Sequence, residues 1–210
     1  MREMQAEART SLTSNPRPQG AARRTLFVRL VTVATLTYSL DQLSKWWAVA
    51  TLSDGQPRPL LGDHVRLLLI RNSGAAFSIG NRSTWLMTVI ACLVLAVVVW
   101  ASRRIGSLGW AWALGLILGG ALGNLTDRML REPGPGRGHV VDFIDYNQLF
   151  IGNVADIAIV SAAVLIAWLS LQGIPIEGKG GSQAAGGDPG GADAAGGDPG
   201  DSAAVNPADA

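Results

Sequence analysis

Two aspartates, Asp142 and Asp156, stand in apolar surroundings. Asp142 lies inside the apolar run 140–144, and Asp156 leads directly into the uncharged stretch 157–176. A charge within an apolar membrane segment costs at least ~2.5–3.5 kcal/mol, so it requires a partner or a role. Taken singly, Asp142 fits a surface acid at a strand end, and Asp156 fits an acid favoured by the dipole at a helix N-terminus.

Taken together, the two carboxylates predict a pair that shares a proton. Two carboxylates close together in a low-dielectric site cannot both ionise easily, so one pKa rises and the pair retains one proton. Such a pair suits hydrolysis of a peptide bond, because one carboxylate takes a proton from water while the other donates one to the carbonyl oxygen. The pair titrates as a unit, so the sequence does not assign the base to either aspartate.

Amide and guanidinium side chains also occur in the polar clusters near the ends of the predicted spans. Asn124 and Arg128 share a helix face at i, i+4, and Asp127 lies at i+3 from Asn124. Asn153 precedes Asp156 by three positions and shares its helical face. We expect Asn124, Arg128 and Asn153 to orient the acids or to hold the substrate backbone. A salt bridge at a helix end accounts for Asp127 and Arg128, but not for Asn124 one turn deeper.

Two further polar clusters lie earlier in the chain. Asp41 and Lys45 have i, i+4 spacing, so they can neutralise each other on one helix face. A structural ion pair and a direct role at a substrate site both remain open for them. Asn72 and Gly74 suit a tight chain reversal that brings backbone close to another group, and a plain turn is the alternative.

The elements that must position these residues are membrane spans. Three stretches without a charged residue, 83–102, 105–126 and 157–176, have 20, 22 and 20 residues. Each is long enough to cross a hydrocarbon core of roughly 30 Å as a helix. A fourth apolar segment, 25–52, is a weaker span because charged residues interrupt it. A cleaved signal peptide ending near Ala50 is the rival interpretation of that segment.

These spans predict an all-α membrane protein with four transmembrane helices and a small β element between helices 1 and 2. The β element is expected within 54–82, and a flexible Gly/Pro-rich loop is expected at 131–138. We divide the chain into a disordered tail at 1–24, a four-helix membrane domain at 25–172 and a disordered Gly/Ala/Asp/Pro-rich tail at 173–210. Four spans place both termini on one face.

Composition and missing motifs exclude several other classes. With 48% hydrophobic and 16% charged residues, the chain does not fit a soluble enzyme, a nucleic-acid-binding domain or a disulfide-stapled module. The single cysteine, Cys92, sits in an apolar span where we expect inert packing, and His64 and His139 have no metal-ligand spacing. We therefore expect no cofactor, no metal and no nucleic-acid partner.

Two alternatives to a peptidase remain open at this stage. One is a small proton-coupled transporter in which Asp41, Asp142 and Asp156 form a relay, although four spans without inverted repeats disfavour it. The other is a membrane scaffold whose polar clusters only fix helix packing.

The clusters, in this order on four spans, resemble the lipoprotein signal peptidase (signal peptidase II) family of bacterial intramembrane aspartic peptidases. The resemblance covers roughly residues 25–171. It rests on four motifs: Asn72-x-Gly74-Ala75-Ala76-Phe77, Gly119-Gly120-x-x-Gly123-Asn124-x-x-Asp127-Arg128, Val141-Asp142-Phe143 and Asn153-x-Ala155-Asp156. The sequence departs from the family pattern at Gly152, where the family has an aromatic residue and this chain has Phe150 two positions earlier. It also departs in its long loop at 131–138.

The resemblance implies that Asp142 and Asp156 are the catalytic aspartates. It implies supporting or substrate-binding roles for Asp41, Lys45, Asn72, Gly74, Asn124, Arg128 and Asn153. The implied substrate is a prolipoprotein whose cysteine carries diacylglycerol, and the implied cut releases the signal peptide just before that cysteine. The implied location is the bacterial plasma membrane, with both termini cytoplasmic and the aspartates near the outer face. We expect membrane lipids as partners and a monomer.

Overall fold

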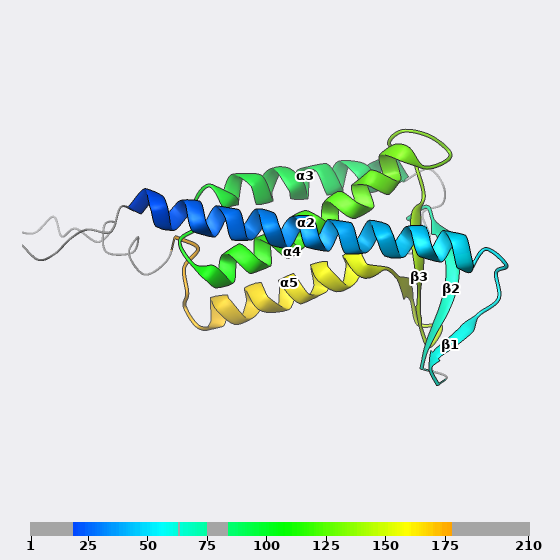
Figure 1. The fold of residues 1–210 in the computed structure, drawn as a ribbon. Coiled ribbons are helices and arrows are strands. Elements are labelled where there is room, and N and C mark those ends of the chain that lie inside the picture. Colours follow the sequence, from blue (N-terminus) through cyan, green and yellow to red (C-terminus); the bar gives the residue numbers. More distant parts are fainter. Residues whose placement is uncertain (1–18, 63, 75–83, 178–210) are drawn as a thin grey trace, which may run out of the picture.

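The computed structural model describes residues 19–62, 64–74 and 84–177. Long helices lie side by side, and a small sheet covers one end of them (Figure 1). The described helices are α2 (Gln19–Thr51), α3 (Thr84–Ser102), α4 (Leu108–Leu130) and α5 (Val154–Leu171). The strands are β1 (Arg58–Leu61), β2 (Val65–Asn72), β3 (Val140–Tyr146) and β4 (Ile151–Gly152). Most of the two expected tails, 1–18 and 178–210, and the motif residues 75–77 lie outside the described residues.

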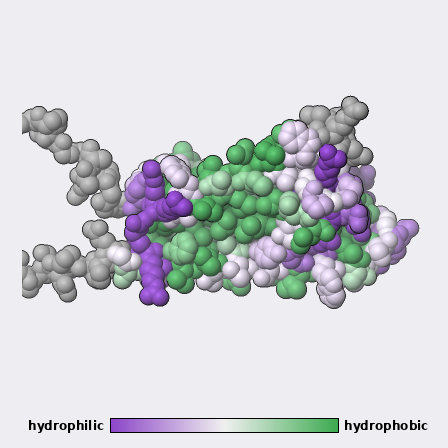
Figure 2. Space-filling model, turned by 90° about the horizontal axis from the view of Figure 1, so that it is seen from above, coloured by the Kyte–Doolittle hydropathy of each residue, from purple (hydrophilic) through white to green (hydrophobic). Residues whose placement is uncertain are grey.

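Three of the described helices, α3, α4 and α5, are long and apolar enough to cross a membrane. Helix α2 is not among them, because Arg29, Asp41 and Lys45 interrupt it. Large apolar side chains such as Leu93 and Val164 point outward from the bundle, as expected of helices that face lipid. Figure 2 shows the resulting apolar surface along the molecule, with hydrophilic residues gathered toward its two ends.

Glycines in α4 allow it to approach both α2 and α5 closely. A Cβ on Gly119 would lie 2.5 Å from the backbone oxygen of Ala34 in α2. A Cβ on Gly120 would lie 2.8 Å from the backbone oxygen of Ala155 in α5. Neither distance is possible for a real side chain, so close packing at these positions requires glycine.

The sheet is larger than the sequence predicted. Its strands are antiparallel in the order β1-β2-β3-β4, and β3 and β4 come from the segment between α4 and α5. The expected β element between the first two helices supplies only β1 and β2. Asp142 therefore lies within β3, paired with Ile70, rather than at a strand end. Val141 and Phe143 of β3 pack on the end of α2, which attaches the sheet to the bundle.

Several boundaries differ from those predicted. Helix α2 begins at Gln19, so the expected N-terminal tail is helical from that residue onward. At the other end of the chain, Trp110 Nε1 donates a hydrogen bond of 2.9 Å to the backbone oxygen of Ile174. The expected C-terminal tail therefore begins later than residue 173. Cys92, expected to be packed inside, is exposed on α3.

The Gly/Pro-rich loop is tied to the end of α4 rather than free of it. The Gly138 N–H donates a hydrogen bond of 3.0 Å to the oxygen of Arg128, and the His139 N–H donates one of 3.0 Å to Glu132. The loop thereby delivers the chain directly into β3. The described chain ends, near Gln19 and Glu177, lie at the end of the bundle away from the sheet (Figure 1).

Candidate active site

The fold brings Asp142 of β3 and Asp156 of α5 to the same residue, Asn153. The Asn153 side chain donates a hydrogen bond of 2.6 Å from Nδ2 to Asp142 Oδ1. The Asn153 backbone N–H donates one of 3.0 Å to Asp156 Oδ2. One fully buried asparagine therefore holds a carboxylate oxygen of each aspartate.

Asp156 is placed by the start of its own helix. Asn153 is the N-cap of α5, and its Oδ1 accepts a hydrogen bond of 3.1 Å from the Asp156 N–H. The Asp156 carboxylate reaches back to the Asn153 N–H, so the two residues form a capping box. Its other oxygen accepts a hydrogen bond of 3.1 Å from Asn124 Nδ2 of α4.

Asp142 is placed by the pairing of β3 with β2. Asn72, at the end of β2, donates a hydrogen bond of 2.8 Å from Nδ2 to Asp142 Oδ2. The Asn72 side-chain oxygen accepts a hydrogen bond of 2.7 Å from the Gly74 N–H. Gly74 has a φ of 92°, which favours glycine. The turn predicted at Asn72 and Gly74 therefore also serves to aim an amide at Asp142.

Burial raises the pKa of Asp142 to about 6. Hydrogen bonds from Asn72 and Asn153 oppose this rise, and the negative charge of Asp156 adds to it. The carboxyl of Asp142 is 2% exposed, so water stabilises its ionised form poorly. Burial therefore favours the protonated form of Asp142.

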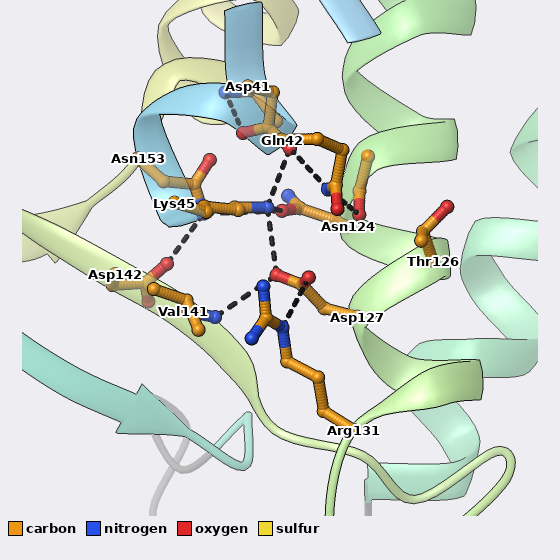
Figure 3. A network of polar contacts seen from close by, with 12 residues as sticks. Asp41, Gln42, Lys45, Asn124, Thr126, Asp127, Arg131, Val141, Asp142 and Asn153 are labelled. Carbon is orange, nitrogen blue, oxygen red and sulfur yellow. Dashed lines mark hydrogen bonds and ion pairs between the residues drawn. The ribbon is translucent and has the colours of Figure 1, made fainter. Parts of the chain in front are cut away.

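Lys45 of α2 is the centre of a buried polar network that lies beside Asp142 and Asn153 (Figure 3). Its Nζ lies 2.8 Å from Asp41 Oδ2 and 3.0 Å from Asp127 Oδ2. It also donates a hydrogen bond of 2.8 Å to Asn124 Oδ1. The ammonium thus has three acceptors, and its contact with Asn124 turns the amide nitrogen of that residue toward Asp156. The pair predicted from the i, i+4 spacing of Asp41 and Lys45 is confirmed.

The two carboxylates bound to Lys45 each hold the backbone next to a candidate catalytic aspartate. Asp41 Oδ1 accepts a hydrogen bond of 3.0 Å from the N–H of Ala155, the residue before Asp156. Asp127 Oδ2 accepts one of 3.1 Å from the N–H of Val141, the residue before Asp142. Lys45 therefore links the supports of both aspartates. This arrangement indicates a positioning role, which the sequence pattern left open.

Residues that sequence reasoning passed over complete this network. Gln42 donates hydrogen bonds of 3.0 Å to Asp41 and 3.1 Å to the backbone oxygen of Gly123. Arg131 Nε donates one of 2.7 Å to Asp127 Oδ1. The i, i+4 spacing of Asp127 and Arg131 was the available signal for the second contact.

Arg128 has a buried nitrogen available for a ligand. Its charge interacts with the carboxylates of Asp142, Asp127 and Asp156. Its Nη1 is buried and has no hydrogen-bond partner among the residues that the structure describes. A buried donor of this kind calls for an acceptor, and a substrate carbonyl oxygen fits that need.

A cavity of about 290 Å³ opens beside Asp156. Its walls are Tyr146, Phe150 and one side of α5 down to Val160 and Ser161. The rings of Tyr146 and Phe150 stack with centroids 4.6 Å apart. A Cβ on Gly152 would lie 3.0 Å both from Phe150 and from Asp156 Oδ2, so Phe150 occupies the space next to a position without a side chain. Although Gly152 departs from the family pattern, the ring of Phe150 therefore still lies beside the site.

Comparisons with known proteins place the chain among similar sequences. The family model described as Signal peptidase (SPase) II matches residues 33–172. A lipoprotein signal peptidase of Leifsonia xyli subsp. xyli is 45% identical over 175 residues, covering 80% of this chain and 81% of that protein. One of Mycobacterium avium is 47% identical over 161 residues, covering 77% and 88%.

Solved structures give the same picture of the fold. A bacterial membrane enzyme at 1.9 Å resolution matches with a TM-score of 0.59 and 28% identity, covering 68% of this chain and 92% of that one. A second bacterial membrane enzyme structure, at 2.3 Å resolution, matches with the same TM-score and identity and is covered to 87%.

Proposed function

Because the chain belongs to the signal peptidase II family of aspartic peptidases, which cleave the signal peptides of bacterial lipoproteins, we propose that Asp142 and Asp156 are its catalytic pair. The observation that carries this proposal is the contact of Asn153 with both carboxylates. The chain is a multi-pass bacterial membrane protein that acts on prolipoproteins. Peptidase activity replaces the transporter and scaffold alternatives.

In the proposed mechanism, Asp142 begins protonated and Asp156 begins ionised. The raised pKa of Asp142 supports this assignment, since a pair of neighbouring carboxylates retains one proton. Asp156 takes a proton from water as the water oxygen attacks the scissile carbonyl carbon, and Asp142 donates its proton to the carbonyl oxygen. In the second step, Asp142 takes back the proton from a hydroxyl of the tetrahedral intermediate. Asp156 then protonates the leaving nitrogen as the C–N bond breaks.

Substrate contacts are assigned to Arg128 and to the cavity beside Asp156. Arg128 Nη1, which has no hydrogen-bond partner among the described residues, would bind a backbone carbonyl oxygen next to the scissile bond. The apolar wall of the cavity, with Ile157 and Val160, would accommodate an apolar part of the substrate. We assign the substrate as a precursor that already carries diacylglycerol on its cysteine, cleaved just before that residue.

We further propose that α2, α3, α4 and α5 all cross the membrane, with both tails cytoplasmic and the catalytic pair near the outer face. At ~1.5 Å per residue, the 33 residues of α2 are long enough to span the bilayer. Its charged residues Asp41 and Lys45 are fully buried and neutralise each other, which lowers the cost of placing them there. We propose that the enzyme acts as a monomer.

The test is cleavage of a lipid-modified precursor by the purified full chain and by Asp142→Asn and Asp156→Asn. Both variants should lose cleavage while remaining folded, and normal cleavage by either one would refute the catalytic pair. Asp145→Asn is a matched control, because Asp145 is also buried on β3 but pairs with Arg66 outside the site. An unmodified precursor tests the lipid requirement separately.

A further inference from the structure

Arg29 is a charged residue on α2 that lies deeper than the basic residues at the end of the helix. It follows Arg24 by five positions, which places it ~7.5 Å further along the helix axis. Its side chain is exposed, and none of the ion pairs between residues 19–62, 64–74 and 84–177 includes it. An arginine at the edge of an apolar span extends its side chain toward the polar interface, where anionic groups can pair with it. Within the described protein, Arg29 has no such partner.

Arg29 stands at one end of an open, mostly apolar groove between α2 and α4. The groove has a volume of about 430 Å³. Its walls include Arg29, Leu36 and Leu40 from α2, and Leu108, Trp112 and Leu116 from α4. From Arg29 to Leu40 the helix advances ~16 Å, about half of a hydrocarbon core of roughly 30 Å. The groove therefore has the depth of one leaflet, with its cation at the outer edge.

The same end of the bundle carries a basic surface that would attract anionic lipids. Arg23 and Arg24 of α2 lie beside Arg103 of the turn between α3 and α4. The Arg104 guanidinium lies 4.3 Å above the Trp100 ring, and tryptophans are typical of the interfacial layer of a membrane. Figure 2 shows hydrophilic residues grouped at this end, next to the apolar surface. Basic clusters at a membrane surface concentrate anionic headgroups.

We propose that the groove between α2 and α4 binds one anionic glycerophospholipid, with its phosphate on Arg29 and one acyl chain along Leu36 and Leu40. The charge of Arg29 matches the phosphate, and the apolar walls match the acyl chain. The groove is as deep as one leaflet, which matches the length of such a molecule. The site is separate from the catalytic pair, which lies at the sheet end of the bundle, so the proposal does not depend on the proposed function. A bound lipid there would brace the contact between α2 and α4.

The test is native mass spectrometry of the full chain released from micelles that contain equal amounts of phosphatidylglycerol and phosphatidylcholine. We expect one retained phosphatidylglycerol in preference to phosphatidylcholine. Arg29→Gln should lower this retention by about tenfold, since it removes a charge-assisted hydrogen bond. Arg24→Gln is the matched control, because Arg24 is on the same helix and does not line the groove. It should change retention by less than about twofold, since its charge lies outside the groove.

A second variant tests whether retention of the lipid depends on the groove itself or only on the surface charge. Leu36→Trp fills the groove and leaves Arg29 in place, so it should also lower retention of the lipid. Leu36 is exposed toward the membrane, so the larger side chain should leave folding unaffected. Equal retention of the two lipids by the unmodified chain would overturn the proposal. Equal losses in Arg29→Gln and Arg24→Gln, or full retention in Leu36→Trp, would overturn it as well.

Discussion

Asn153 Nδ2 lies 2.6 Å from Asp142 Oδ1, joining the cap of α5 to the middle of β3. The same asparagine caps α5 through its Oδ1, so its amide has one orientation that satisfies both contacts. The residue that caps the N-terminus of α5 thereby also sets the distance between β3 and that helix. One residue therefore holds both candidate catalytic carboxylates, Asp142 through its side-chain amide and Asp156 through its backbone N–H.

Because Asn153 both caps α5 and contacts Asp142, the substitution Asn153→Ser should separate the effect of capping from the effect on catalysis. Serine is a good N-cap residue, so α5 should remain capped. Serine cannot reach Asp142 with an amide, so the carboxylate loses a donor and its position. We expect kcat for precursor cleavage to fall about a hundredfold, which is typical of a small misplacement of a catalytic group. Thermal unfolding should change little. An unchanged kcat would show that the contact between Asn153 and Asp142 is not used.

Lys45→Met should destabilise the protein strongly. It leaves Asp41 buried without its cation and removes one of the two cations that contact Asp127. Removing one partner of a buried pair costs about 3–5 kcal/mol. Adding Asp41→Asn to Lys45→Met should recover part of this loss, because the orphaned charge disappears. Thermal unfolding in micelles measures both effects.

The exposed pair Arg58 and Asp54 supplies the control for Lys45. It has the same i, i+4 spacing and an N–O distance of 2.8 Å, but both side chains are about half exposed. Arg58→Met should therefore change the unfolding temperature little. If Arg58→Met and Lys45→Met lowered the unfolding temperature by similar amounts, burial of the Lys45 network would not increase the cost of removing its cation.

The sequence was sufficient to find the candidate catalytic residues but not the supports that connect them. Asp142 and Asp156 were visible as acids in apolar runs, and the pairing of Asp41 with Lys45 followed from helix periodicity. The contact between Lys45 and Asn124 joins residues 79 positions apart, and Asn72 reaches Asp142 across 70 positions. No local pattern encodes such contacts, because they depend on how β3 pairs with β2 and how α4 packs on α2.

The sequence did not predict strands β3 and β4 for a related reason. The run 140–144 has little alternation of apolar and polar residues, because β3 is buried on both sides. The sequence pattern therefore indicates an apolar run that contains one acid and does not indicate a strand. The partner strand β2 comes from a distant segment, and local periodicity carries no information about that pairing.

The raised pKa of Asp142 predicts how cleavage depends on pH. Its folded pKa, about 6, lies above the ordinary 3.8, so Asp142 keeps its proton between these values and loses it as pH rises further. If the protonated form donates to the carbonyl oxygen, kcat/KM should fall as pH rises through about 6. The fall in kcat should occur at a higher pH, since bound substrate excludes water and disfavours the anion further.

Variants around Asp142 test the cause of that shift. Burial is the largest cause, and Asp156 adds to it, so Asp156→Asn should lower the pKa of Asp142. Asn72→Ala removes a hydrogen bond that favours the anion, so it should raise the same pKa. Carboxyl ¹³C NMR of labelled aspartate follows the titration directly. Movement of the pKa in the opposite direction in either variant would contradict this account of the pair.

The aromatic ring beside Asp156 predicts the effect of restoring the family pattern at Gly152. A Cβ at this position would meet both Phe150 and Asp156 Oδ2 at 3.0 Å, so Gly152→Phe alone should crowd the site and lower cleavage by roughly tenfold. Combining Gly152→Phe with Phe150→Gly moves the ring rather than adding one. The double variant should therefore recover most of the lost activity. Phe150→Gly alone is the control, and it should raise KM more than it lowers kcat, because it removes a wall of the cavity. If the double variant were no better than Gly152→Phe, Phe150 would not be occupying the space of the missing aromatic side chain.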